Sequence, residues 1–372
     1  MTDDCQRHSR YRFHRLALAP LVASNPSQAL HGIRDELPAT DENLFLRFLL
    51  DNGLAPLWHE LLSKGDCPAP FSPEGLAELY KAYLSAAASY LRQQHTLGKI
   101  TDVFAAAAIP HAVFKGVHIR GLIYDNPAVR HACDIDILVA RENRVRAIQA
   151  LLAAGFSFHP EAANISHEGH LATVNAALDL HWDILRPGRT RVDLTDVLLA
   201  EKEQFPDHWG LSSEATLFIM LVHPVFTKYS TTPQASLIRM IDLVRWTRSR
   251  RIDWDKVASY LERGGVKTAG WITATWLTML TGISLPESFT NRIKPGKTRA
   301  WYLRKWLKNN LPTRLLNYPA LVQTGFTLPA HDTWQDAWRA TLQVLHEKKE
   351  ASKKTEDLLQ AIDKETSPMR RK

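Results

Sequence analysis

The hydrophobic period of the chain changes twice, and these changes limit the folds that it can adopt. In residues 28–104, and again in 213 to about 345, apolar residues recur three and four positions apart, which predicts amphipathic helices. Between these blocks the segments HAVF, DIDILV, HLATV and ALDLHWDI are short and β-branched or alternating, which is typical of strands. One strand block between two helical blocks predicts an α+β fold that is mostly helical and contains a small mixed β-sheet.

We therefore expect the chain to have four parts. An N-terminal helical region covers residues 1–104, an α/β core covers 105–205, and a C-terminal helical domain covers 206–345. Residues 346–372 mix charges densely, so we expect a tail with a frayed helix and a disordered end.

Composition narrows the class of protein. A hydrophobic content of 45% with 23% charged residues is ordinary for a soluble globular protein. No segment reaches the roughly 18 uninterrupted apolar residues of a membrane span. The three cysteines have no paired spacing, which favours a reducing compartment. The apolar run of RLALAPLVAS is short for an export signal and is interrupted by Pro20. We expect a cytoplasmic protein, and its net charge of +7 mildly favours anionic partners such as nucleotides.

Acidic residues mark two of the predicted strands. Alternation places Asp134 and Asp136 on one face, and places Asp179, His181 and Asp183 on one face of the later strand. Neighbouring carboxylates repel each other unless a cation lies between them, and Mg²⁺ accepts such oxygen ligands. An isolated pair at a strand end would simply be solvated. A neighbouring strand that brings Asp179 beside the first pair instead predicts three carboxylates around one or two metal ions.

A lysine-glycine turn precedes the acidic strands. The segment VFKG ends a strand at Lys115-Gly116, and we expect a helix from Val117. Glycine lets the backbone approach a ligand closely, and the amides at a helix N-terminus favour phosphate. The order strand, Lys-Gly turn, helix, arginine, acidic strand and second acidic strand therefore predicts a site for phosphate and metal.

This order resembles the nucleotidyltransferase (polymerase β-like) superfold, and in particular the uncharacterised nucleotidyltransferase family. The resemblance extends over roughly residues 40–285. The matching motifs are Lys115-Gly116, Arg130 followed by Asp134 and Asp136, and LDLHW at 178–182.

The resemblance implies a metal-dependent nucleotidyltransferase. Asp134, Asp136 and Asp179 would hold two Mg²⁺ (or Mn²⁺) ions and be the catalytic residues, while a nucleoside monophosphate moves from an NTP to a hydroxyl acceptor and pyrophosphate leaves. The nucleotide-binding residues would be Lys115, Gly116, Arg130 and Lys228. Arg130 is equally compatible with an ion pair to one of the nearby aspartates. His181 would orient Asp179 or the acceptor, or it would have only a structural role in the packing at the strand end.

We expect ATP as the nucleotide. The acceptor stays open among a sugar, a peptide, a protein and a small metabolite. Nucleic acid is not an expected partner, because the basic, tryptophan-containing segment 291–310 is more typical of a solvated helix face. A glycosyltransferase would have its apolar strand before the acidic pair, and a haloacid dehalogenase phosphatase would need threonine at Leu138.

The main alternative is a non-catalytic, nucleotide-binding or scaffold protein with the same fold. Its basis is Val117, which follows Gly116 where the superfold has a second small residue.

Two further residue pairs carry expectations. Arg239 and Asp242 are three positions apart in a helical segment, so we expect them to pair as neighbours on one helix. His167 and His170 lack a cysteine and a close third ligand, so zinc is not expected there.

Overall fold

A mixed β-sheet forms the centre of the computed structural model, which describes residues 2–37, 41–64, 70–160, 167–226, 233–309 and 320–366. The seven strands within these ranges lie in the order β3-β4-β5-β2-β1-β7-β6. They are β1 (His111–Phe114), β2 (Ile135–Val139), β3 (Ser157–His159), β4 (Glu168–Ala172), β5 (Ala177–His181), β6 (Glu203–Gln204) and β7 (Trp209–Gly210). The pairs β2–β5 and β1–β7 are parallel, and the others are antiparallel.

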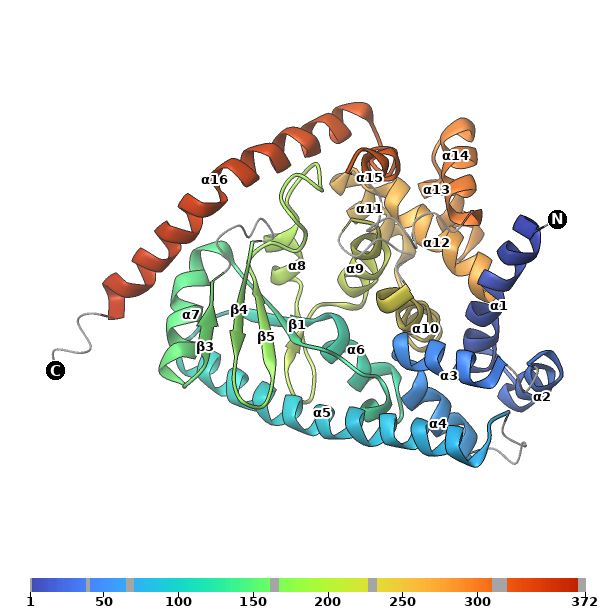
Figure 1. The fold of residues 1–372 in the computed structure, drawn as a ribbon. Helices are drawn as coiled ribbons and strands as arrows, with labels where there is room; N and C mark the ends of the chain where they lie inside the picture. Colours follow the sequence, from blue (N-terminus) through green and yellow to red (C-terminus); the bar gives the residue numbers. More distant parts are fainter. Residues whose placement is uncertain are drawn as a thin grey trace.

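Helices make up most of the remaining structure (Figure 1). Before the sheet come α1 (Thr2–Val22), α2 (Pro26–Glu36), α3 (Glu42–Asp51), α4 (Ala55–Lys64) and α5 (Pro73–Ala106). Between the strands lie α6 (Lys115–Ile123), η2 (Pro127–Val129), η3 (Arg141–Asn143), α7 (Arg144–Ala153) and α8 (Thr195–Ala200). After it follow α9 (Ser213–Phe226), α10 (Pro233–Ser249), α11 (Trp254–Gly264), α12 (Lys267–Thr281), α13 (Glu287–Ile293), α14 (Lys297–Lys308), α15 (Ala320–Thr327) and α16 (Trp334–Thr366). The predicted fold class, mostly helical α+β, is confirmed.

The long helix α5 connects the N-terminal helices to the sheet. Its start is defined by Ser72, whose side chain accepts a hydrogen bond from the amide of Gly75, and by Pro73 in the first turn. The helix runs along one side of the whole molecule (Figure 1). Its C-terminal part buries Leu97, Ile100 and Phe104 in the core beneath the sheet. These contacts fix the sheet relative to the N-terminal helices.

The sheet separates two hydrophobic cores because alternate residues of a strand point to opposite faces. On one face Val113, Ile135 and Ile137 pack with α5 and α7. On the other face Phe114 and Leu138 join a larger core formed by the helices that precede and follow the sheet. Polar residues of β2 and β5 on this second face therefore point toward the helical part of the chain.

Helix α16 passes over the end of the sheet (Figure 1). It is continuous across position 346, where the expected tail begins. Near its end Ile362 is buried in the core beneath α7, and its carbonyl accepts a hydrogen bond from Gln149 Nε2 at 3.1 Å. The first part of the expected tail is thus a packed helix in this structure, while residues 367–372 lie outside the described ranges.

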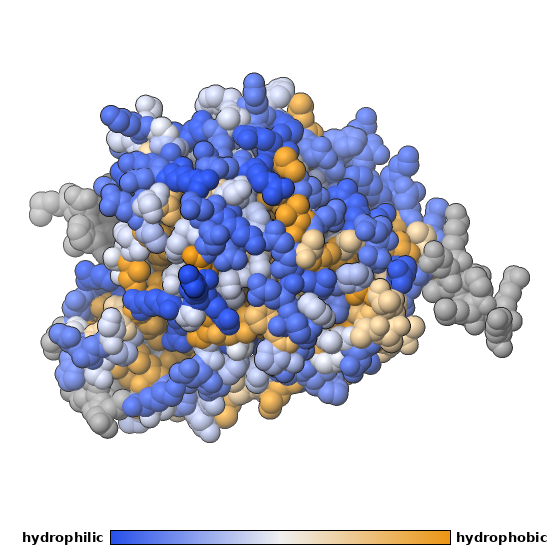
Figure 2. Space-filling model, turned by 180° about the vertical axis from the view of Figure 1, so that it is seen from behind, coloured by the Kyte–Doolittle hydropathy of each residue, from blue (hydrophilic) through white to orange (hydrophobic). Residues whose placement is uncertain are grey.

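The helices of the described ranges are all too short or too polar to cross a bilayer. Figure 2 shows the face opposite to that of Figure 1, where hydrophilic residues cover most of the surface and hydrophobic ones form patches between them.

Candidate active site

Strand pairing brings the acidic residues together. The parallel register of β2 and β5 sets Asp136 directly beside Asp179, and sets Leu138 beside His181. Residues paired in this way project from the same face of the sheet. One carboxylate oxygen of Asp136, one of Asp179 and one ring nitrogen of His181 all lie within 4.8 Å of one another. The structure therefore contains a compact group of three metal-ligand atoms on the face that points toward the helical part.

This group differs from the predicted set of three carboxylates. Asp134 is not part of it: the residue lies just before β2 and lines a neighbouring cleft. His181 takes the third place. Asp183, which alternation placed with Asp179, lies past the end of β5 and pairs with Arg141 at 2.6 Å and with His167. Strand alternation no longer applies at either position, because both residues lie outside the strands.

Lys115 forms an ion pair with one member of the group, Asp136. Its Nζ donates to Asp136 Oδ1 at 2.6 Å and lies 3.3 Å from His181 Nε2. His181 Nε2 is in turn 2.9 Å from the same oxygen of Asp136. Burial alone would raise the pKa of the Asp136 carboxyl, but Lys115 and the hydrogen bond from His181 outweigh burial and hold the pKa well below its usual range. Asp136 is therefore ionised, and a cation already compensates its charge.

The turn at Lys115 is conformationally special. Lys115 has a left-handed backbone with φ of +57°, a conformation that costs a side-chain-bearing residue about 1 kcal/mol or more. Helix α6 starts here, two residues earlier than predicted, and its N-cap residue Phe114 makes no side-chain hydrogen bond to the first turn. The amides of this uncapped turn, which an isolated helix would expose to water, are thus available to a ligand.

Gly116 is required by close packing. A Cβ atom at this position would lie 2.6 Å from Arg130 Nη1 and 3.2 Å from the Cβ of Ala132. A side chain would therefore displace the guanidinium. The sequence predicted a close approach to a ligand at Gly116, and the structure adds a close approach to Arg130.

Arg130 pairs with a residue that the sequence did not indicate for it. Its Nη2 donates to Asp242 Oδ2 at 2.6 Å, and Tyr124 Oη donates to Asp242 Oδ1 at 2.7 Å. Burial disfavours the charged guanidinium, but Asp242 outweighs this effect and raises the pKa of Arg130. The alternative to nucleotide binding by Arg130 is an ion pair with Asp134 or Asp136. The structure instead pairs Arg130 with Asp242 of α10.

The prediction from the sequence did not include two residues that contact the acidic group. The antiparallel register of β4 and β5 sets His170 opposite Asp179 and Glu168 opposite His181. His170 Nδ1 lies 2.6 Å from Asp179 Oδ1, and Glu168 Oε2 lies 3.1 Å from His181 Nδ1. A hairpin alignment around the four residues 173–176 would have found both pairs, because the two members of each pair are equidistant from that turn.

A cleft adjoins the group on the side of β1 and α6. Its volume is about 450 Å³, and it lies between the sheet, the loop after α3, and helices α9 and α10. Lys115, Gly116, Arg130, Asp134 and Asp136 all line it. The cleft thus brings together the predicted nucleotide-binding residues with two of the predicted metal ligands. Lys228, the other predicted nucleotide-binding residue, lies outside the described residues.

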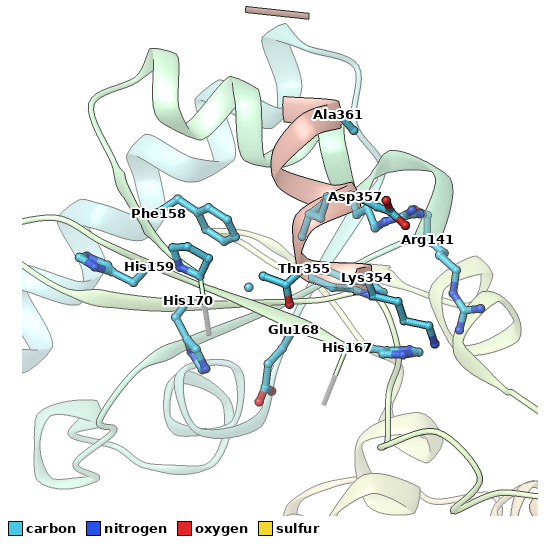
Figure 3. Close-up of a pocket in the computed structure, with 15 residues that line it drawn as sticks. Arg141, Phe158, His159, His167, Glu168, His170, Lys354, Thr355, Asp357 and Ala361 are labelled. Atoms are coloured by element: carbon cyan, nitrogen blue, oxygen red, sulfur yellow. The ribbon is translucent and has the colours of Figure 1, made fainter. Parts of the chain in front are cut away.

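A second cavity of about 280 Å³ lies on the other side of β4, against α16. Figure 3 shows Glu168 and His170 pointing away from Thr355 and Asp357 of α16. Both residues line this cavity, and their side chains also pair with Asp179 and His181 of the acidic group. Asp136, Asp179 and His181 themselves do not line the cavity, so we do not include it in the site.

The sequence over residues 38–280 matches the family described as uncharacterised nucleotidyltransferases. This match spans more than half of the chain and contains the acidic group, Lys115 and the α10 partner Asp242. The chain belongs to this nucleotidyltransferase family. No curated protein matches it. Helices α13–α16 lie outside the part of the chain that the family match covers.

Proposed function

We propose that the protein is a metal-dependent nucleotidyltransferase that moves a nucleoside monophosphate from an NTP to a hydroxyl acceptor and releases pyrophosphate. The main observation is the group of Asp136, Asp179 and His181, whose ligand atoms lie within 4.8 Å of one another. Asp136 of this group lines the 450 Å³ cleft. Membership of the nucleotidyltransferase family supports the same reaction class.

The donor set fits a divalent metal. Carboxylate oxygens are the ligands that Mg²⁺ and Mn²⁺ prefer, and the low pKa of Asp136 means that its oxygens are ready to bind a cation at neutral pH. Asp136 and Asp179 would hold the metal, with His181 beside them and Asp134 contributing from the cleft. Bound there, Mg²⁺ or Mn²⁺ would supply Lewis-acid stabilisation of charge on the reacting phosphate.

The protein's own residues would bind and orient the two substrates. Lys115 and the uncapped first turn of α6 face the cleft and would hold the triphosphate, with ATP as the first nucleotide to test. Asp179 would receive the acceptor hydroxyl, since it lies on the far side of Asp136 from the cleft residue Lys115 and is oriented by His170. The acceptor oxygen would bond to the α-phosphorus, the bond to the pyrophosphate oxygen would break, and the hydroxyl proton would leave toward the Asp179 side.

Labelled nucleotides test this proposal. The protein is incubated with each α-labelled NTP, Mg²⁺ or Mn²⁺ and a cell extract, and both pyrophosphate and labelled products are measured. We expect one product class to become labelled and the label to disappear in Asp136→Asn. The matched control is Asp125→Asn, which changes an exposed aspartate between α6 and η2.

The same assay decides on the non-catalytic alternative. The observation that favours it is the ion pair of Lys115 with Asp136, which places an ammonium beside a metal-ligand oxygen. The contrary result is a wild-type protein that binds nucleotide and yet releases no pyrophosphate with any acceptor, whether Mg²⁺ or Mn²⁺ is present. That result would establish the binding or scaffold role instead.

A further inference from the structure

Arg239 lies on α10, across the cleft from the sheet. The sequence predicts that it pairs with Asp242, one helical turn further on. In the structure both oxygens of Asp242 are engaged by other residues: Arg130 binds through Nη2 at 2.6 Å and Nε at 3.3 Å, and Tyr124 donates at 2.7 Å. The expected pair of Arg239 and Asp242 does not form, because the buried Arg130 takes the carboxylate.

Arg239 has no carboxylate partner at ion-pair distance among the described residues. Its guanidinium instead lies near His223, with 3.5 Å between Nη1 and Nδ1, which is the outer limit of a hydrogen bond. Burial lowers the pKa of Arg239 to about 10, and the nearby charge of Arg130 adds to this effect. The carboxylates of Asp242, Asp136 and Asp134 act in the opposite direction, from beyond ion-pair distance. The group is still a cation at neutral pH. It is therefore a half-buried positive charge that has carboxylates in its surroundings but none at ion-pair distance among the described residues.

Such a charge is unfavourable unless a counter-ion reaches it. The atoms that share the cleft with Arg239 indicate which anion fits. Lys115 and the uncapped start of α6 lie in the same cleft, and each favours a phosphate. A guanidinium presents its N–H groups in a planar fork that matches phosphate oxygens, which a lysine cannot do.

We propose that Arg239 binds the phosphate chain of the nucleotide, from the α10 wall of the cleft opposite Lys115. This inference rests on the proposed function, and it adds a nucleotide-binding residue that belongs to none of the motifs around the acidic strands. The phosphate chain would then lie between cations on two walls of the cleft, one from the start of α6 and one from α10.

Calorimetric titration tests this assignment with three probes: inorganic tripolyphosphate, ATP and AMP, at one ionic strength, with and without Mg²⁺. The variants are Arg239→Met and Arg239→Lys. The control is Arg251→Met, which removes the same charge from an exposed position just after α10. We expect Arg239→Met to weaken binding of tripolyphosphate and ATP by about 10- to 100-fold, the effect of losing a charge-assisted contact, and to affect AMP much less. Arg239→Lys should recover part of the loss, and Arg251→Met should bind as wild type.

A thermal melt without ligand separates binding from folding. Because Arg239 lacks a close counter-ion, Arg239→Met should melt at the wild-type temperature or above it. Unchanged binding of tripolyphosphate and ATP by Arg239→Met overturns the assignment. If wild type releases pyrophosphate in that case, the proposed function stands without it. If wild type binds tripolyphosphate through Arg239 but neither binds nor turns over any NTP, the phosphate contact stands and the proposed function fails. A wild type that binds none of the probes overturns both.

Discussion

Replacing Asp136 by asparagine should destabilise the protein even when no metal is present. Repulsion between neighbouring carboxylates would predict the opposite, because neutralising one of them relieves it. In the structure Asp136 is instead held by Lys115 at 2.6 Å and by His181 at 2.9 Å. The side chains of Asp136 and Lys115 are only 6% and 20% exposed, so water screens their attraction weakly.

The expected loss can be worked out from these two contacts. Hydrogen bonds to a charged group contribute about 1.5–3 kcal/mol, and neutral ones about 0.5–1.5 kcal/mol. Asparagine keeps the shape and one acceptor oxygen, so each contact should lose about 1 kcal/mol. Lys115 also remains largely buried without its counter-ion, which brings the total to about 2–4 kcal/mol. This value overlaps the lower part of the range of about 3–5 kcal/mol for breaking a buried ion pair.

The pH dependence gives this prediction a signature. The folded-state pKa of Asp136 lies below its unfolded value of about 3.9. Its contribution to stability is therefore fully present above that value and is lost as the pH falls through the folded-state pKa. The difference between wild type and Asp136→Asn should be constant between about pH 5 and 8 and should shrink below about pH 4.

Urea unfolding followed by tryptophan fluorescence, with EDTA present, measures the difference, and Asp125→Asn is the control at an exposed site. Adding Lys115→Met to Asp136→Asn should cost less than the sum of the two single changes, because the ammonium and the carboxylate depend on each other. Equal or greater stability of Asp136→Asn at pH 7 would refute the view that this ion pair, rather than repulsion, dominates the site without metal.

Three further predictions concern the same site. Calorimetry should show that Lys115→Ala weakens triphosphate binding more than monophosphate binding, whereas equal weakening would limit Lys115 to holding the turn. The same change should strengthen Mn²⁺ binding without nucleotide, because the ammonium beside Asp136 is gone. Asp179→Asn should leave nucleotide bound yet stall transfer, so pyrophosphate release should fall while nucleotide affinity persists; a parallel loss of both would contradict a role on the acceptor side. Gly116→Ala should lower stability by about 1–3 kcal/mol through overpacking against Arg130, whereas Gly98→Ala, which meets no atom within 4 Å in helix α5, should be neutral or stabilising in the same thermal melts.

Local sequence patterns were enough to predict much of the fold. HAVF matches β1 at both ends, and the strand predicted at 134–139 differs from β2 by one residue. Period and turn chemistry depend on neighbouring residues, so they can be read without knowing the tertiary structure. The start of α6 was misplaced by two residues because the left-handed backbone of Lys115 has no signal in the sequence.

The sequence by itself determined which side chains are available to the candidate site and in what order they occur along the chain. Two acidic strands and a Lys-Gly turn indicated a site for metal and phosphate. The metal part of this prediction depends on the alternation of a strand, which places carboxylates two positions apart on the same face. Within the described residues, the pairing of β2 with β5 then placed Asp136 beside Asp179, the arrangement that the prediction required.

Only the tertiary structure decided which of these side chains meet. His170 joined Asp179 through strand register, and Arg130 took Asp242 across 112 positions, which left Arg239 facing the cleft without that carboxylate. Each outcome depends on the distance between segments that are remote in sequence. Several carboxylates and cations lie close enough to form alternative ion pairs, and the packing of the helices against the sheet determines which of these pairs form.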